Sequence, residues 1–465
     1  MTGEKTSIRS GAAGALQQWT LAAFVVLALL LGGGGSPSPV SELALQLGAA
    51  CILAAAFAAG AFRYRSAGRA VWTLAAIAAA LPLAQLVPLP PALWQSLPGR
   101  GPIAENLALV GGGEDWRAFS IAPAKTLASL LAIIPPVGLM LVAAMSPETA
   151  IRRALWAIVA MALLSAVVGG LQVASDGQSG YLYTESHRGW VTGFFANRNA
   201  AADLFLIALA ILVVLENEAF RRPPSGSGAM QSRAAMMFPA GLLLLAALLM
   251  TGSRTGIVLL AGGLLFAVAV FLTRAGGAAR TRLVTGGFLA VAMVGIAVAG
   301  WMQGGLRTVA ARFSASDDLR AQIWPDAVHA AGQFWPAGSG VGTFREAFGP
   351  SQSLETVGVA AVNRAHNDYL ELAIEGGAAG LVLLLLAAIV LARAGWMRWQ
   401  AGGGSRGAVL CAAAIIAVLA LHSLVDYPLR SMALASVFAL GAGILAKPPN
   451  PALNPALFRS QSGAT

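Results

Sequence analysis

Charged residues are scarce in this sequence. Only 11% of the 465 residues are Asp, Glu, Lys or Arg, whereas 57% are hydrophobic. Soluble domains carry about a quarter charged residues, so the composition excludes a string of soluble domains. Apolar runs long enough to cross a bilayer recur along the whole chain. The sequence therefore predicts a single all-α polytopic membrane domain over residues 1–465.

Cysteine is nearly absent too. Cys51 and Cys411 both lie inside apolar runs, so we expect packing roles and exclude a disulfide framework or a cysteine-based metal site. The sequence also lacks a P-loop, a glycine-rich dinucleotide motif after a strand and a nucleophile elbow. We expect neither a metal nor a cofactor.

The apolar runs predict about twelve transmembrane helices. They cover residues 17–33, 42–62, 70–88, 125–145, 154–174, 200–216, 235–251, 255–273, 284–303, 377–393, 407–424 and 430–446. The first run follows Lys5 and Arg9, as in a signal peptide, but no clean cleavage site follows it, and an uncleaved span is the better interpretation.

The net charge of +10 reflects topology and not nucleic-acid binding. With a cytoplasmic N-terminus, most of the 30 basic residues fall in short cytoplasmic loops, as the positive-inside rule requires. Residues 447–465 then form a cytoplasmic tail, rich in Pro and Asn, for which we expect no fixed structure.

The remaining basic residues fall on the opposite, periplasmic side, where arginine should be rare. We interpret them as the lining of a pocket for an anionic ligand. They lie in or beside three long outer segments, 89–124, 175–199 and 304–376. The last is the largest: it should be partly helical, interrupted at Pro325, with a glycine-rich bend at 336–344.

The polar stretch 363–371, NRAHNDYLE, precedes a long apolar run and contains His366. An imidazole can accept a proton from a hydroxyl near neutral pH, so His366 is the candidate general base. Asn367 and Asp368 could orient it, and Arg364 could anchor the loop. The structural alternative is a histidine that merely caps the helix that follows.

Arginine forks suit phosphates, and two arginines stand in polar motifs beside predicted spans. Arg254 lies in TGSRTG, where the alternative is a helix cap paired with Asp426 or Glu375. Arg188 opens RGWVTGFFANRNAAA, which also holds Asn197 and Asn199, the latter a possible helix N-cap.

Four further polar residues have other interpretations. Arg320 is a supporting cation on the large outer segment. Asp426 and Arg430 are interpreted as a salt bridge across a tight turn, with His422 as a second possible partner of Asp426.

Together these motifs resemble those of the O-antigen ligase and Wzy-type polymerase superfamily of bacterial membrane glycosyltransferases. The matching pieces are RGWVTGFFANRNAAA, GSRTG, LRAQIWPDAVHAAGQFWPAGSGVGTF, AHNDYLELAIEGGAAGL and LHSLVDYPLR, spread over most of residues 100–440.

The resemblance implies a metal-independent inverting transferase of the bacterial inner membrane with a periplasmic active site. Its donor would be an undecaprenyl-diphosphate-linked glycan and its acceptor a glycan or the lipid A-core. Arg188 and Arg254 would bind the diphosphate and His366 would deprotonate the acceptor. Membrane lipids, and a chain-length regulator or other polysaccharide-assembly proteins, would be partners, and nucleic acid would not.

Two other classes of protein remain open at this point. A transporter of polysaccharide or lipid-linked substrate would also have many spans, but it should show ionisable groups in mid-membrane and two similar halves. A non-catalytic scaffold would tolerate loss of His366. Whether the enzyme would be a ligase or a polymerase does not follow from these residues.

Overall fold

The computed structural model describes residues 18–34, 39–58, 67–184, 186–221, 227–272, 319–358, 361–402 and 405–448. These residues are almost entirely helical, because their apolar runs contain few glycines or prolines at positions that would stop a helix. The long helices are α2 (Pro39–Ala58), α3 (Arg69–Gln85), α8 (Glu148–Ala174), α9 (Arg198–Arg221), α10 (Ser227–Met250), α11 (Arg254–Leu272), α16 (Asp368–Ala401), α17 (Arg406–His422) and α18 (Met432–Ala446). The consecutive pair α6 (Pro123–Ala132) and α7 (Ile134–Met145) crosses the bundle as one unit, and a further apolar helix covers Gln18–Leu31.

Five of these units are long and apolar enough to cross a membrane: Val40–Ala58, Pro123–Met145, Glu148–Ala174, Arg198–Glu218 and Asp368–Ala401. Six shorter apolar helices pack with them. Each predicted span that falls on the described residues coincides with one of these helices. The predicted span 284–303 lies outside the described residues, as does most of the tail, so the total of twelve stays a prediction.

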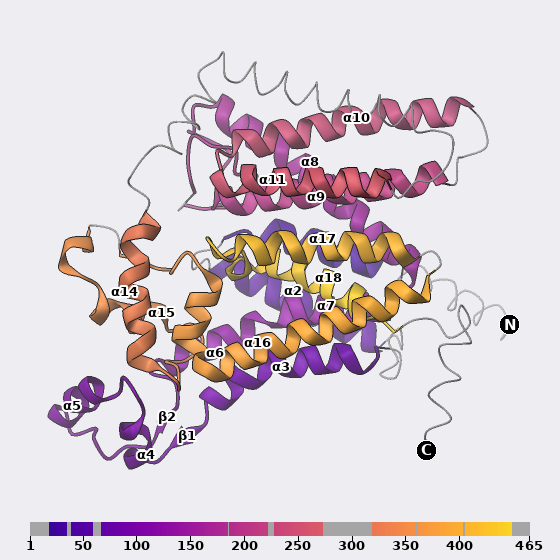
Figure 1. The fold of residues 1–465 in the computed structure, drawn as a ribbon. Coiled ribbons are helices and arrows are strands. Elements are labelled where there is room, and N and C mark those ends of the chain that lie inside the picture. The colour runs from indigo at the N-terminus through magenta and orange to yellow at the C-terminus, as the bar shows by residue number, and fades with distance from the viewer. Residues whose placement is uncertain are drawn as a thin grey trace, which may run out of the picture.

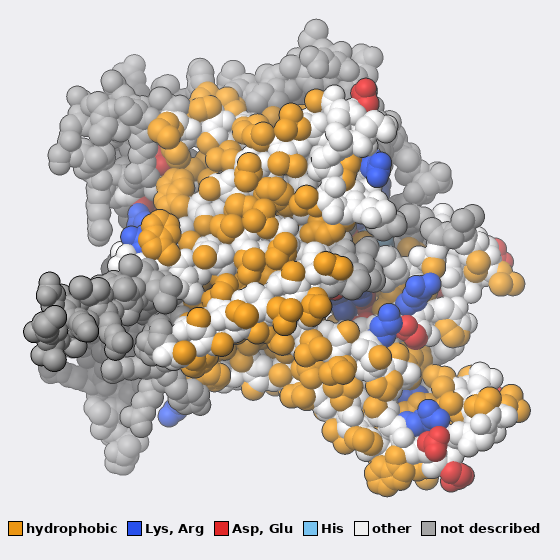
Figure 2. Space-filling model, turned by 180° about the vertical axis from the view of Figure 1, so that it is seen from behind, with side chains coloured by type: hydrophobic (Ala, Val, Ile, Leu, Met, Phe, Trp, Pro, Cys, Tyr) orange, Lys and Arg blue, Asp and Glu red, His pale blue; other side chains and the backbone are white. Residues whose placement is uncertain are grey.

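The helices form a bundle with a cap of further helices at one end (Figure 1). The cap contains α4 (Pro91–Ser96), α5 (Gly101–Leu109), α14 (Leu319–Phe334) and α15 (Phe344–Phe348). Hydrophobic side chains cover most of the middle of the face in Figure 2, with charged side chains gathered toward its margins. This distribution is the one that a lipid bilayer requires.

The only sheet among the described residues is a two-stranded ribbon beside α4. In it, β1 (Pro88–Leu89) pairs antiparallel with β2 (Arg117–Ala118). The fully buried Arg100 ties this ribbon to the rest of the cap, because its Nη2 donates to the carbonyl oxygens of Phe119 at 2.8 Å and Gly338 at 3.1 Å. The predicted outer segments 89–124 and 304–376, far apart in sequence, are thus in contact through Arg100 and Gly338.

Two helices differ from the expected boundaries. α14 continues through Pro325, which was expected to interrupt it. α16 begins at Asp368, before the predicted span 377–393, and its backbone leaves helical geometry at Gly377 (φ 55°). A side chain at Gly377 would collide with the backbone of Pro336 and Ala337, so glycine permits both the kink and the contact with the glycine-rich bend.

The two cysteines are free, as expected. Cys411 is buried and packs in the bundle, whereas Cys51 is exposed on the surface of α2, so the prediction of a packing role was wrong for Cys51.

Candidate active site

His366 lies at the polar end of the bundle, in the short connection that enters α16. Its backbone is in the left-handed region (φ 50°), which is uncommon for a residue other than glycine. The residue before it is fixed twice: Ala365 accepts a hydrogen bond from Trp324 Nε1 at 3.0 Å and donates one to Glu371 Oε2 at 3.2 Å. His366 is therefore held in an unusual conformation by its neighbours on both sides.

Asn367 is the residue that caps α16. Its side-chain oxygen accepts hydrogen bonds from the backbone N–H groups of Tyr369 and Leu370, both at 3.0 Å. The structural alternative for His366, a helix cap, is thus wrong. The His366 ring is 27% exposed and has no part in capping the helix.

The imidazole of His366 is paired with Asp426, a residue 60 positions later. Nδ1 lies 3.1 Å from Asp426 Oδ1. A carboxylate can only accept a hydrogen bond, so Nδ1 carries the proton and Nε2 is left as the basic nitrogen. The Tyr427 ring packs edge-on against the imidazole, with centroids 4.9 Å apart. This is the orientation that a general base needs.

Asp426 remains ionised despite being buried. Burial by itself raises the pKa of Asp426. The hydrogen bond from His366 and the positive charges of His422, His366 and Arg320 outweigh that effect and lower the pKa to about 2. Asn199 Nδ2 adds a hydrogen bond of 2.5 Å to Oδ2. Asp426 is therefore a fixed negative charge behind the His366 ring.

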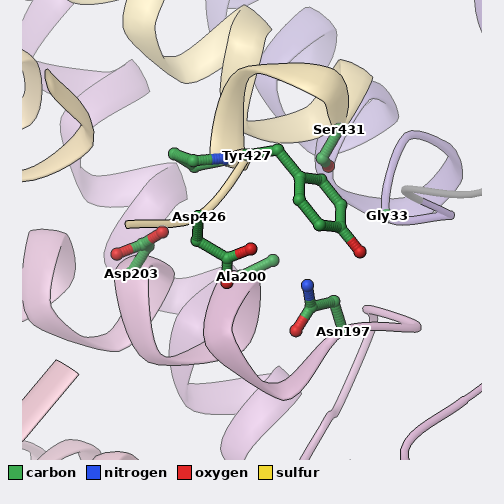
Figure 3. Close-up of a pocket in the computed structure, with 8 residues that line it drawn as sticks. Gly33, Asn197, Ala200, Asp203, Asp426, Tyr427 and Ser431 are labelled. Carbon is green, nitrogen blue, oxygen red and sulfur yellow. The ribbon is translucent and has the colours of Figure 1, made fainter. Parts of the chain in front are cut away.

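A small pocket opens beside this pair (Figure 3). It joins three parts of the chain: the loop after the first helix, the start of α9, and the turn between α17 and α18. Its lining consists of Gly33, Asn197, Ala200, Asp203, Asp426, Tyr427, Pro428 and Ser431. In Figure 3, Asp426 lies between Asp203 and Asn197, and the Tyr427 ring extends toward Asn197.

The two asparagines of the FANRNAAA motif have separate roles. Asn197 precedes α9, and its Oδ1 accepts the backbone N–H of Asn199 at 2.9 Å, so Asn197 caps the helix. The prediction of Asn199 as the N-cap was wrong. The Asn199 side chain instead holds Asp426, which links the start of α9 to the His366 pair.

Arg430 does not pair with Asp426, and the predicted salt bridge between them was wrong. Its Nη2 lies 2.8 Å from Glu375 Oε2 and 3.1 Å from Glu371 Oε1, and Arg364 binds the same Glu371 oxygen at 2.8 Å. Asp368 completes this cluster, with Oδ1 3.7 Å from Arg430 Nε, and also accepts from Ser423. Arg364 and Asp368 thus fix the start of α16 and do not contact the imidazole.

Two arginines open neighbouring helices. Arg198 is the first residue of α9 and Arg254 the first of α11. The first turns of these helices touch, since a Cβ on Gly256 would lie 2.8 Å from Ala202 Cβ. The Arg198 guanidinium stacks on Trp190 at 4.7 Å, and Trp190 packs against Gly252 of the TGSRTG motif.

Helix N-termini carry partial positive charge and free N–H groups. Two of them, each with an arginine, therefore make this surface suited to an anion. Arg188 lies in the loop before α9, exposed, with its guanidinium 5.6 Å from the Tyr181 ring centre. Arg320, on α14, is close enough to Asp426 for its charge to lower that pKa.

Sequence reasoning missed Asp426 as the partner of His366, and it missed Asp203 altogether. His422 does approach Asp426, at 3.9 Å, but its short contact is with Asp203. An aspartate inside a predicted apolar span was the available signal, because such a residue needs a partner or a function.

No curated protein matches the chain significantly. One family model does match: residues 239–385 fit the Wzy_C model, described as O-antigen ligase. The match runs from α10 into α16 and contains Arg254, Arg320, Arg364 and His366, but it ends before Asp426. The O-antigen ligase match over residues 239–385 supports the resemblance of these motifs to the O-antigen ligase and Wzy-type superfamily.

Proposed function

We propose that this chain is an inverting, metal-independent glycosyltransferase of the bacterial inner membrane, active on the periplasmic face. It transfers a glycan from undecaprenyl diphosphate to the hydroxyl of an acceptor, either the lipid A-core or a second lipid-linked repeat. The observation that carries the proposal is the His366–Asp426 pair beside the arginine-bearing starts of α9 and α11.

The reaction needs one proton acceptor and one anion site. Nε2 of His366 takes the acceptor hydroxyl proton while the acceptor oxygen bonds to the anomeric carbon. The bond from that carbon to the diphosphate oxygen breaks, and its electron pair leaves with the diphosphate. The imidazolium then returns its proton to solvent. Because the diphosphate is a good leaving group, a separate general acid is not required.

The cationic surface stabilises the charge that develops on the leaving diphosphate. Arg254 and Arg188 are the predicted contacts, and the position of Arg198 at the start of α9 adds a third. Asn197, Asn199, Asn367, Asp368, Arg320 and Arg364 support the site by holding the helices and Asp426 in place. The base is linked to the start of α9 through Asp426 and Asn199, and Arg198 opens the same helix, so one substrate can meet both the base and the cations.

The test is transfer by the purified protein in proteoliposomes, with an undecaprenyl-diphosphate-linked oligosaccharide as donor. His366→Ala should lower the rate by about 10²–10⁴-fold, the range of general-base catalysis. The matched control is His329→Ala, since His329 is exposed on α14 and forms a hydrogen bond with Gln333. Wild-type product from His366→Ala would overturn the proposal.

Arg254→Lys tests the anion site. Lysine keeps the charge but loses the planar fork, and we expect a fall of roughly 10²-fold. Arg117→Lys is the control, because Arg117 is an outer arginine paired with Asp115. Equal falls in both variants would exclude a specific role for Arg254.

Supplying the donor alone or with lipid A-core separates the two acceptors. Longer lipid-linked chains from donor alone indicate a polymerase, and glycan joined only to the lipid A-core indicates a ligase. Activity should persist in EDTA. Movement of the glycan across the vesicle membrane without a new glycosidic bond would instead support a transporter.

A further inference from the structure

A second histidine–aspartate pair lies behind the first. His422 is the last residue of α17 and Asp203 lies in the second turn of α9, and both side chains are fully buried. Nδ1 of His422 lies 2.5 Å from Asp203 Oδ1. A buried ion pair of this kind costs free energy to form in a bundle interior, yet the proton transfer described above does not use it.

The two pairs are joined through Asp426. The other nitrogen of His422, Nε2, lies 3.9 Å from Asp426 Oδ2, and Asp426 Oδ1 lies 3.1 Å from His366 Nδ1. The order Asp203, His422, Asp426, His366 therefore runs from the bundle interior to the candidate base. It alternates carboxylates with imidazoles.

The carboxylates on both sides of His422 decide whether its ring is protonated. A neutral ring that donates Nδ1–H to Asp203 would point its Nε2 lone pair at the Asp426 carboxylate, so two acceptors would face each other. A protonated ring presents an N–H to each carboxylate. Two buried carboxylates without a cation between them would be far more costly. The geometry thus favours a protonated His422.

The charged and titratable groups near His422 come from separate elements of the fold. They are Asp203 from α9, Asp426 from the turn after α17, Arg320 from α14, and His366 through Asp426. When His422 is protonated and His366 is neutral, the two carboxylates are balanced by two cations, His422 and Arg320. With His422 uncharged, the cluster has one excess negative charge, which favours a proton on His366.

We propose that His422, held protonated between Asp203 and Asp426, is a positioning residue that keeps the His366 base free of its proton. This inference rests on the proposed function. His422 acts through Asp426: it fixes the carboxylate that orients His366, and it cancels the negative charge that would otherwise hold a proton on the imidazole. Asp426 can therefore orient the His366 ring without keeping that ring protonated.

The pH dependence of glycan transfer in proteoliposomes tests this inference. His422→Gln removes the cation, and we expect the acid limb of the rate profile to move to higher pH by about one unit. The rate would then fall roughly tenfold at a pH below the limb and return to the wild-type value above it. An unchanged limb, or an equal loss at every pH, would overturn the inference.

The double variant Asp203→Asn/His422→Gln is the matched control for charge. It removes one carboxylate together with the cation, which restores the balance, and its acid limb should return toward that of the wild type. Asp203→Asn alone leaves no excess negative charge, so its limb should stay or move to lower pH. A limb displaced to higher pH in either variant would overturn the inference, even if His422→Gln does not accumulate in the membrane.

Failure of the proposed function gives a different result. In that case the wild type makes no product, or His366→Ala makes as much product as the wild type. The present inference fails if transfer depends on His366 but the acid limb of its rate profile does not change when the charge of residue 422 is removed.

Discussion

Two buried polar clusters meet at the turn between α17 and α18, and they are built from different cations. One consists of His366, Asp426, His422 and Asp203, with Arg320 nearby, and the other of Arg364, Arg430, Glu371, Glu375 and Asp368. Arginine stays charged at every physiological pH, whereas imidazole gains and loses a proton within that range. The arginine cluster can therefore only hold the structure, and the histidine cluster can take part in proton transfer.

The contacts of the two clusters agree with this division. Arg430 reaches three carboxylates of α16, and the His366 backbone is fixed by Glu371 through Ala365. The arginine cluster thus sets the position of the loop that the histidine cluster uses. Substitutions in the arginine cluster should lower the stability of the protein, and substitutions in the histidine cluster should lower the rate of glycan transfer.

The largest effect on chemistry is expected for Asp426→Asn. The amide can donate as well as accept, so it no longer enforces the tautomer with a proton on Nδ1, and the transfer rate should fall on the order of 10³-fold. Asp368→Asn is the control in the other cluster, and its rate per folded molecule should stay within about threefold. Similar rates for Asp426→Asn and wild type would remove Asp426 from the mechanism.

The pH dependence of transfer tests whether the ionisation of Asp426 limits the rate. The pKa of Asp426 is lowered from 3.8 to about 2. Its ionised form therefore contributes stability that is fully present above about pH 4 and is lost as the pH falls toward 2. A loss of transfer between pH 8 and pH 5 therefore does not come from this carboxylate, and Asp426→Glu should show the same loss.

Arg430→Gln should lower stability and spare chemistry. It leaves Glu375 without its ion-pair partner, and breaking a buried pair costs about 3 kcal/mol or more. The measurement is thermal unfolding in detergent, with Arg345→Gln on the cap as an exposed control. A stable Arg430→Gln protein with a transfer rate reduced 100-fold would contradict the division between the two clusters.

The smallest effect is expected for Asn199→Ala. It removes one hydrogen bond to Asp426 Oδ2, which costs about 1 kcal/mol, and the transfer rate should fall roughly five- to tenfold. The measurement is the initial rate at saturating donor. Asn197→Ala removes the cap of α9 instead, and it should lower thermal stability more than Asn199→Ala does.

The helices could be predicted because each is an apolar run bounded by polar residues. His366 could be singled out as a candidate because a polar stretch precedes such a run. The pairing with Asp426 could not, because it depends on how the turn after α17 docks against the start of α16, 60 residues away. The same holds for Arg430, which follows Asp426 closely in sequence yet binds carboxylates on another helix.

Asp203 shows a different reason why a residue of this cluster could not be predicted from the sequence. Its neighbours are apolar and the span was predicted correctly, so hydropathy gave it no weight. Only the packing of α9 against α17 shows that a histidine faces it. Capping was also missed at Asn197 and Asn367, since in each motif a neighbouring residue was an equally good candidate.

The pocket also has a consequence for the order of biosynthesis. Gly33 follows the first helix, Asn197 and Asp203 come from the middle of the chain, and Tyr427 and Ser431 precede the last helix. Ser431 Oγ and the backbone N–H of Ala433 both donate to the carbonyl of Gly32, which joins the first and last helices directly. A chain that enters the membrane from its N-terminus cannot complete this pocket until its final helix has been inserted, so a partly synthesised chain has no assembled site.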